Sequence, residues 1–167
     1  MIYDKAFVID FSKRTQKNLK VIDDIKANHI DDSKSIGPKV FEDTHLVNSC
    51  LGLLVFPRKG CLKNIPKELD LTSEGWPSYL ADDGFKSPSN IQQLIRHLRN
   101  GIAHRNLKFD SDKDYNIKSI RIWDKCPKWQ VTWSIPDFRK FVMKFSDMLI
   151  NNDYCSQCPG CDKSDSD

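Results

Sequence analysis

Apolar residues recur at helical spacing in four segments of the chain. The first covers 3–27, where no glycine or proline interrupts the pattern, and the second covers 38–56. The third begins near Ser87 or Ser89, two residues of a type that caps helices well, and the fourth begins at about Pro136. These four segments predict a mainly α-helical protein built as a helical bundle. The apolar stripe of the third segment consists of Ile91, Leu94, Ile95, Leu98 and Ile102.

Between the third and fourth segments the apolar period changes from helical spacing to strict alternation. Ile120 and Ile122 alternate with polar residues within 117–123, and tryptophans alternate within 129–135. The residues between these runs, DKCPK, are typical of a turn, so the pattern predicts a β-hairpin before the last helix. An isolated hairpin is marginally stable in water, and we therefore expect these two strands to pack on the helical bundle.

Length and composition indicate one domain followed by a flexible C-terminal tail. A chain of 167 residues with 39% hydrophobic content suffices for one core, which we assign to 1–152. Within it, 57–88 holds four of the eight prolines and three of the seven glycines, which predicts an irregular insertion. The polar tail 153–167 is predicted to be flexible.

The sequence predicts a cytoplasmic protein with no membrane segment. It contains no apolar run of about 18 residues, the length that a membrane-spanning helix needs. The N-terminal segment carries Asp4, Lys5 and Asp10 within its apolar pattern, which is not typical of a signal peptide.

The tail contains three cysteines at a spacing compact enough for chelation, Cys155, Cys158 and Cys161. Structural zinc sites use four ligands, and no fourth ligand is apparent. The residues that could supply one are Cys61, Cys126, His29 or a residue of another chain. Zinc binding at the tail is therefore one candidate and an unliganded tail is the other, and the rest of the sequence predicts no cofactor.

Positive charge is concentrated around the third helix. The net charge of +3 does not by itself indicate a nucleic-acid ligand. Between Asp83 and Asp110, however, there is no acidic residue. The cations of this window are Lys86, Arg96, Arg99, Arg105 and Lys108, and His97 and His104 lie among them.

Three residues with complementary chemistry lie together at the end of the third helix, Arg99, Asn100 and His104. On a regular helix Asn100 and His104 are one turn apart, whereas Arg99 and His104 are about 140° apart around the axis. Gly101 weakens the helix here and allows close approach of another backbone or a substrate. We expect the three side chains to converge if the helix bends near Ala103, or if a second copy of the chain supplies the partner.

These residue types suit cleavage of RNA. Histidine transfers protons near neutral pH, arginine binds phosphate, and asparagine can orient a ring or a phosphate oxygen. Attack of a ribose 2′-hydroxyl on the adjacent phosphate needs proton transfer and stabilisation of negative charge, and needs no metal ion. The spacing alone also fits solvated cations at a helix C-terminus, which the helix dipole favours.

The segment RNGIAH, residues 99–104, resembles the Arg-polar-x-x-x-His motif of HEPN-domain ribonucleases. Blocks such as FEDTHLVNSCLGLLVFPRK, LIRHLRNGIAHRNLKF and WQVTWSI extend the similarity, to a plasmid-borne HEPN subfamily, over about 7–150. The resemblance implies a four-helix bundle that forms a homodimer, with the third helices meeting at a shared cleft. It also implies a metal-independent endoribonuclease of a toxin–antitoxin, abortive-infection or anti-phage system, with an antitoxin protein as a candidate partner.

The same resemblance implies a role for each residue of the motif. His104 would be the general acid and base, Arg99 would stabilise the phosphate, and Asn100 is the polar residue after the arginine. HEPN toxins that are inactivated by adenylylation carry a tyrosine two residues after the histidine, where this chain has Asn106. Regulation by that modification is therefore not predicted.

Further residues are candidates for supporting roles. Glu42 or Asn48 would contact His104, and a solvated face or a satisfied buried polar pair is the alternative for both. We assign RNA-binding roles to Arg96, Arg105 and Lys108. The hairpin tryptophans Trp123, Trp129 and Trp133 either cover the bundle or stack on RNA bases, and the shared face of Trp129 and Trp133 favours covering.

Two other functions remain open from the sequence. One is a catalytically silent HEPN module that binds RNA or pairs with an antitoxin. The other is a structural protein whose third helix only forms a dimer interface. Cleavage of RNA that is lost on His104→Ala separates the nuclease from both.

Overall fold

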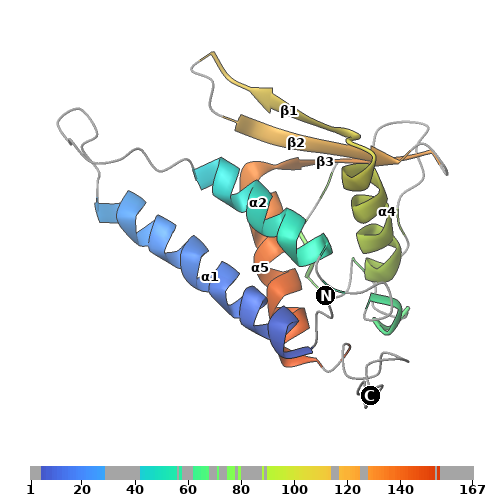
Figure 1. Ribbon diagram of the computed structural model, residues 1–167. Helices are drawn as coiled ribbons and strands as arrows, with labels where there is room; N and C mark the ends of the chain where they lie inside the picture. Colours follow the sequence, from blue (N-terminus) through green and yellow to red (C-terminus); the bar gives the residue numbers. More distant parts are fainter. Residues whose placement is uncertain are drawn as a thin grey trace, which may run out of the picture.

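Four helices and a three-stranded sheet make up the described part of the chain (Figure 1). The helices are α1 (Lys5–Asn28), α2 (Glu42–Val55), α4 (Ile91–Ala103) and α5 (Ile135–Asn151), and the strands are β1 (Leu107–Ser111), β2 (Ile117–Asp124) and β3 (Trp129–Ser134). The computed structural model describes residues 5–28, 42–55, 57, 62–67, 71, 75–77, 79, 88, 90–113, 117–124, 128–152 and 154. The prediction of a mainly helical protein is confirmed.

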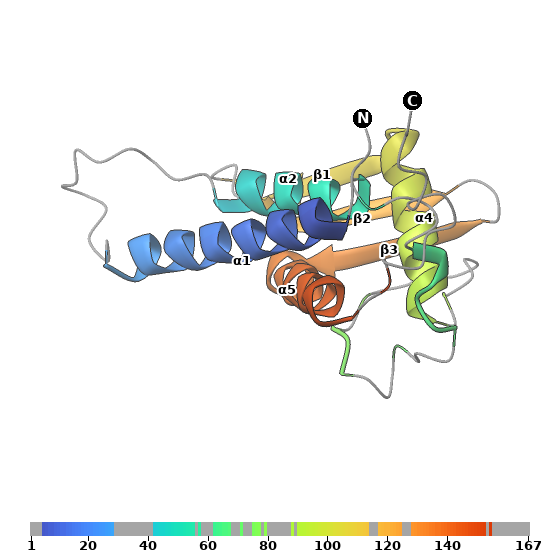
Figure 2. The same cartoon turned by 60° about the horizontal axis from the view of Figure 1, so that its bottom comes forward.

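Helices α1, α2 and α5 pack on one another, while α4 packs on β2 and on one side of α2 (Figures 1 and 2). A buried hydroxyl group joins α5 to α1, because Ser146 donates to the carbonyl oxygen of Ser12 at 3.1 Å. The buried Ser12 hydroxyl donates within α1, to the carbonyl oxygen of Val8 at 2.8 Å. These bonds satisfy polar groups that would otherwise be costly in the core. Helix α4, which carries Arg99, Asn100 and His104, thus packs against the sheet and is separate from the contact between α1 and α5.

The sheet is antiparallel with the strand order β1-β2-β3, and the helices lie on one of its faces (Figure 1). Ile120 and Ile122 of β2 are buried on the inner face and pair with Trp133 and Val131 of β3. The predicted hairpin is confirmed as β2–β3, but the prediction of only two strands was wrong because β1 adds a third. Its sequence, LKFDS, is short and partly exposed, so it lacks the strong alternation that marks β2 and β3.

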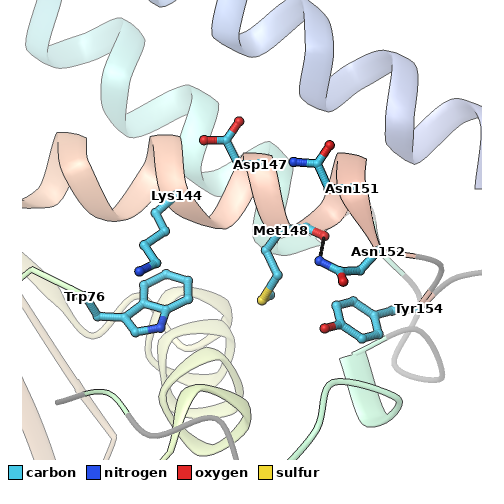
Figure 3. Close-up of a pocket in the computed structure, with 7 residues that line it drawn as sticks. All are labelled: Trp76, Lys144, Asp147, Met148, Asn151, Asn152 and Tyr154. Carbon is cyan, nitrogen blue, oxygen red and sulfur yellow. Dashed lines mark hydrogen bonds between the residues drawn. The ribbon is translucent and has the colours of Figure 1, made fainter. Parts of the chain in front are cut away.

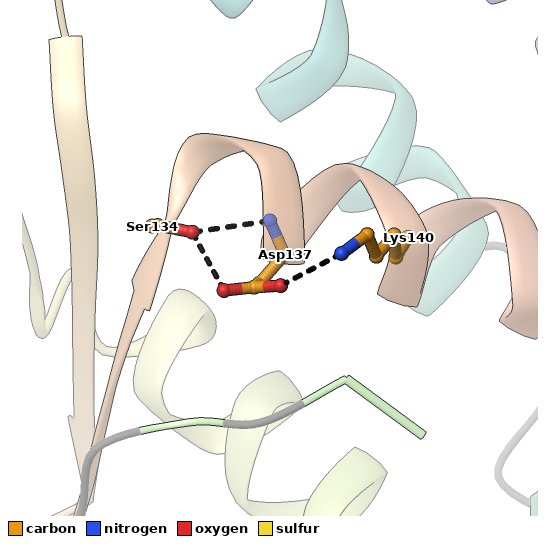
Figure 4. A network of polar contacts seen from close by, with 3 residues as sticks. All are labelled: Ser134, Asp137 and Lys140. Atoms are coloured by element: carbon orange, nitrogen blue, oxygen red, sulfur yellow. Dashed lines mark hydrogen bonds and ion pairs between the residues drawn. The ribbon is translucent and has the colours of Figure 1, made fainter. Parts of the chain in front are cut away.

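Helix α5 begins directly after β3 with a hydrogen-bonded cap (Figure 4). The Ser134 hydroxyl accepts the backbone N–H of Asp137 at 3.2 Å and donates to the Asp137 carboxylate at 2.7 Å. Lys140 pairs with the same carboxylate at 3.3 Å. The hydrogen bond from Ser134 and the pairing with Lys140 lower the pKa of Asp137. A negative charge in the first turn also complements the helix dipole, so the cap fixes where α5 leaves the sheet.

Aromatic side chains fill the space between the sheet and α5. The Trp133 ring lies 5.2 Å from that of Phe141, and both residues are buried. Trp129 is buried as well, so the prediction that these two tryptophans cover the core is confirmed. Two residues of the 57–88 segment extend this cluster: the Trp76 ring lies 5.8 Å from Phe141, and the Tyr79 ring lies 5.9 Å from Trp133. The described part of the insertion therefore contributes to the core.

Close packing of α4 on β2 depends on Gly101, which is buried. A Cβ atom at this position would lie 2.6 Å from Cγ2 of Ile122 and 2.8 Å from the carbonyl oxygen of Trp123. The backbone oxygen cannot move without shifting β2, and Ile122 is fully buried. The close approach predicted at this glycine is made by the sheet.

We expect Gly101→Ala to lower the free energy of unfolding by about 1–3 kcal/mol, the usual cost of overpacking. This loss would occur although alanine is the better helix former by about 1 kcal/mol. Chemical denaturation measures the change, with Ala103→Gly as the control at an exposed position of the same helix. The control should also destabilise, but by no more than about 1 kcal/mol. A Gly101→Ala variant as stable as the wild type would contradict the packing.

No helix in the described part of the chain is long and apolar enough to cross a membrane.

Candidate functional site at the end of helix α4

Helix α4 brings the Arg-Asn-His motif to its C-terminal end. Its N-cap is Asn90, whose side chain accepts the backbone N–H of Gln93 at 2.9 Å. The prediction of a serine cap was therefore wrong, since asparagine caps equally well and stands next to the first helical residue. The predicted apolar stripe is buried at Ile91, Leu94, Ile95 and Leu98, whereas Ile102 is only partly buried. This burial fixes the rotation of α4 and hence the directions of the motif residues.

The helix ends at Ala103, and His104 is its C-cap. The backbone N–H of Asn106 donates to Gly101 O at 2.7 Å, and that of Arg105 donates to Ile102 O at 3.0 Å. These two bonds form a Schellman motif, which requires a left-handed residue at the position after the cap. That residue is Arg105, with a φ of 57°, where glycine is usual. The chain thus places an arginine at a position that local backbone energetics would assign to glycine.

We expect Arg105→Gly to raise the free energy of unfolding by about 0.5–1 kcal/mol, because glycine adopts this conformation without a steric penalty. Arg105→Ala is the matched control, since it also removes the cation but keeps the strained backbone. Denaturant unfolding of the two variants separates the backbone term from the charge. If both variants had equal stability, the left-handed conformation of Arg105 would carry no cost.

A buried carboxylate lies beside the motif. One oxygen of Asp124, at the end of β2, accepts the Asn100 side-chain amide at 3.0 Å and lies 3.2 Å from Nδ1 of His97. Asp124 is 7% exposed and His97 is 6% exposed. The His97 ring also stacks on Trp129, with centroids 5.1 Å apart. We call His97, Asn100 and Asp124 the Asp124 cluster.

The Asp124 cluster holds Asn100 by its amide nitrogen. Because Asn100, Gly101 and His97 all contact β2 or the residue at its end, this side of α4 is fixed to the sheet. The backbone carbonyl of Asn100 in turn accepts the N–H of His104 at 3.0 Å. The sheet therefore determines where the end of the helix, and with it His104, is placed.

The other motif residues face more open surroundings. His104 is exposed, and Arg99 is partly buried, which lowers the pKa of its guanidinium without discharging it at neutral pH. The helix is regular through Ala103, so Arg99 and His104 of one chain stay about 140° apart around the axis. A bend near Ala103 was one of two conditions for their convergence, and the helix shows none up to that residue. Within one chain only Asn100 and His104 share a face.

The three residues predicted to bind RNA, Arg96, Arg105 and Lys108, are all exposed. Lys108 pairs with Asp110 on the same strand at 3.1 Å. The segment without acidic residues in the sequence therefore meets two carboxylates in space, Asp124 under the helix and Asp110 beside Lys108. The cations at the surface near the helix end are consequently Arg96, Arg99 and Arg105.

Among the described residues, Asn48 of α2 forms no hydrogen bond with His104. Asn48 is exposed, and Glu42 is the first residue of α2, with its side chain outside the described residues. Their contact with His104 stays a prediction. Asp124 makes a different polar contact with the motif, to Asn100.

The candidate metal ligands Cys155, Cys158 and Cys161 lie outside the described residues. Within the described residues, no group of three or more His, Cys, Asp or Glu side chains is arranged to hold a metal ion. Cys50 is buried in the core, and burial raises the pKa of its thiol. This cysteine therefore stays protonated and is a poor ligand or nucleophile.

A hollow of about 430 Å³ lies at the end of α5 that points away from the sheet (Figure 3). Lys144 lies over the Trp76 ring, 4.9 Å from its centroid, and Tyr154 forms the opposite wall. Asp147 accepts a hydrogen bond from Gln16 at 2.6 Å. Lys144, Asp147 and Asn152 of this hollow are thus engaged in structural contacts, and none of its lining residues belongs to the motif.

Sequence reasoning missed Asp124 and treated His97 only as part of a basic window. The sequence did contain a signal for Asp124. Alternate residues of a strand point to the same face, so Asp124 lies on the same buried face of β2 as Ile120 and Ile122. A carboxylate on the buried face of a strand requires partners, and His97 and Asn100 supply them.

Comparison with known proteins gives one family. The family model described as HEPN pEK499 p136 matches residues 1–155. No curated protein and no solved structure matches the chain.

Proposed function

Since the chain belongs to the HEPN pEK499 p136 family, we propose that it is a metal-independent endoribonuclease of the HEPN type. The observation that supports this most directly is the end of α4, where His104 is exposed at the C-cap and Asn100 is held by Asp124. Arg99 adds a permanent positive charge next to Asn100. A proton-transfer group and a phosphate-binding group thus stand on one short segment.

In the proposed reaction His104 accepts the proton of a ribose 2′-hydroxyl, and the 2′-oxygen attacks the adjacent phosphorus. The bond from phosphorus to the 5′-oxygen breaks, and the leaving oxygen takes up a proton. Arg99 stabilises the negative charge that develops on the phosphate oxygens. The products are a 2′,3′-cyclic phosphate and a 5′-hydroxyl end. The nucleophile comes from the RNA itself.

We further propose that the complete site forms between two copies of the chain. Arg99 and His104 of one chain point to different sides of α4, so one copy presents only part of the set at any one face. Two α4 helices meeting across a two-fold axis, in a bundle of the HEPN type, would bring Arg99 of one copy toward His104 of the other. The family resemblance supports this arrangement and supports a toxin or anti-phage role, with an antitoxin protein as a candidate partner.

The test is cleavage of single-stranded RNA by the purified protein in EDTA, with analysis of the product ends. We expect 2′,3′-cyclic phosphate and 5′-hydroxyl ends, and no cleavage of the same sequence as DNA or as 2′-O-methyl RNA. Cleavage that requires a divalent metal, or that proceeds on the 2′-O-methyl substrate, would contradict the mechanism. RNA binding that weakens with salt but leads to no cleavage would favour a silent RNA-binding module instead.

A further inference from the structure

The sheet has a second face, opposite the helices, which no helix or strand of the described residues covers (Figure 1). Side chains alternate between the two faces along each strand, and paired residues on neighbouring strands share a face. Because Ile120 and Ile122 point inward, Ser119, Arg121 and Trp123 of β2 belong to the other face. We call this second face the outer face.

Pairing across the strands defines the outer face in rows. Arg121 is opposite Lys108 on β1 and Thr132 on β3, and Trp123 is opposite Gln130 on β3. Apart from Ile117 at the start of β2, the β2 residues of this face are polar or aromatic. The inner rows are mainly apolar and include Leu107, Phe109, Ile120, Ile122, Val131 and Trp133. Trp123 and Arg121 are partly exposed, whereas Gln130, opposite Trp123, is buried. An aromatic ring next to a guanidinium on a polar surface is typical of a face that stacks a base and pairs with a phosphate.

Two polar atoms of this face lack hydrogen bonds within the described part of the chain. They are Nε of Arg121 and Oγ1 of Thr132, which belong to directly opposite residues on β2 and β3. Neither atom is accessible to water, and a buried polar atom without a partner costs about 1–3 kcal/mol. A phosphate that drew the Arg121 side chain outward would relieve this cost for the guanidinium.

The outer face is continuous with the end of α4. The backbone N–H of Trp123 donates to Asn106 O at 3.1 Å, and Asn106 is two residues after His104. Arg105, which is exposed and has the left-handed backbone conformation, lies between His104 and Asn106 in the chain. The motif, Arg105 and the Trp123–Arg121 pair therefore follow one another from the end of the helix onto the central strand of the sheet.

We propose that the outer face binds the single-stranded RNA segment that flanks the cleaved phosphate. Trp123 stacks on a base of this segment, and Arg121 binds a phosphate in competition with the nearby carboxylate of Asp110. Lys108 contributes less, because Asp110 pairs with it directly. The inference rests on the proposed function for the identity of its ligand. It makes Trp123 and Arg121 substrate-binding residues outside the motif.

The test measures binding of a fluorescent single-stranded 2′-O-methyl oligoribonucleotide, which cannot be cleaved through its 2′-oxygen. Stacking on one aromatic residue is worth about 5- to 150-fold in affinity, so Trp123→Ala should weaken binding within that range. Trp123→Phe should retain most of the affinity, because phenylalanine still stacks. Arg121→Ala should weaken binding and reduce the slope of log affinity against log salt by about 0.7. His45→Ala, at an exposed position of α2 outside the motif, should bind as the wild type does.

The matched control for Arg121→Ala is Lys118→Ala. Lys118 is an exposed cation of β2 that does not belong to the outer face, because it lies an odd number of positions from Arg121 along the strand. It pairs with Asp112 at 3.0 Å. It should leave both affinity and salt slope unchanged. If Trp123→Ala unfolds, Arg121→Ala decides the question, because Arg121 is partly solvated and its loss is read from both the affinity and the salt slope.

Wild-type affinity in both Trp123→Ala and Arg121→Ala, or no detectable binding of the oligonucleotide to the wild type, would overturn the proposal. If the wild type cleaves RNA but neither Trp123→Ala nor Arg121→Ala changes the affinity for the oligonucleotide, only the proposed binding role of the outer face is refuted. Binding that depends on Trp123 and Arg121 without any cleavage of natural RNA would instead refute the nuclease and leave the binding face standing.

Discussion

His104→Ala is expected to lower the rate of RNA cleavage by about 10²–10⁴-fold, the usual contribution of a general acid–base group. The free energy of unfolding should change by no more than about 0.5 kcal/mol, because the side chain is exposed at the C-cap and not packed in the core. Loss of activity with unchanged stability would assign a chemical role to the imidazole. The measurement is single-turnover cleavage of RNA in EDTA, together with denaturant unfolding.

His45→Ala is the matched control for this variant, since His45 is an exposed histidine on α2. It should cleave RNA at the wild-type rate. Arg99→Lys extends the test to the phosphate contact: lysine keeps the charge but not the two parallel N–H groups, so activity should fall although the charge remains. Equal activity of His104→Ala and the wild type would refute the assignment of His104.

The helices could be predicted from the sequence because each buries a continuous apolar stripe. In α4 and α5 the buried residues follow the helical period closely, as at Leu94, Leu98, Phe138 and Phe145. The ends were less predictable, since Asn90 and the serines near it are equally good caps. Strand β1 was missed for a different reason: its five residues are stabilised by pairing with β2, a contact between segments that local periodicity does not encode.

The motif could be found from the sequence because Arg99, Asn100 and His104 are local to one helix end. The Asp124 cluster could not be found by the same reasoning, since Asp124 lies 24 residues after Asn100 and reaches it only through the folding of β2 against α4. The linear window without acids suggested a uniformly positive surface. In space, a carboxylate is needed under that window because the buried amide and imidazole require an acceptor or a charge partner.

The Asp124 cluster also explains why the site depends on the sheet. Gly101 permits the contact between α4 and β2, Asp124 fixes Asn100, and the Schellman bonds carry the chain from His104 into β1. Each of these contacts joins the end of the helix to a strand. The sequence suggested that the strands are a small addition to the helices. In the structure, their contacts with the end of α4 position the motif.

Asp124→Ala is expected to lower the free energy of unfolding by about 3 kcal/mol, because it leaves the buried His97 ring and the Asn100 amide without their shared acceptor. Asp124→Asn should cost less, since the amide oxygen can still accept from Asn100. Both variants should also slow RNA cleavage, because the end of α4 loses its attachment to β2. Denaturant unfolding and RNA cleavage on the same samples measure the two effects.

The matched control is Asp110→Ala, which removes a partly exposed carboxylate that pairs with Lys108 and accepts the Ser119 hydroxyl on the same sheet. An exposed ion pair is worth at most about 1 kcal/mol, so this variant should remain close to the wild type. A double-mutant cycle of Asp124→Ala with Asn100→Ala isolates the hydrogen bond between them and should give a coupling energy of about 0.5–3 kcal/mol. If Asp124→Ala were as stable as Asp110→Ala and the cycle gave no coupling, Asp124 would not fix Asn100, and the motif would have to be positioned by the helix alone.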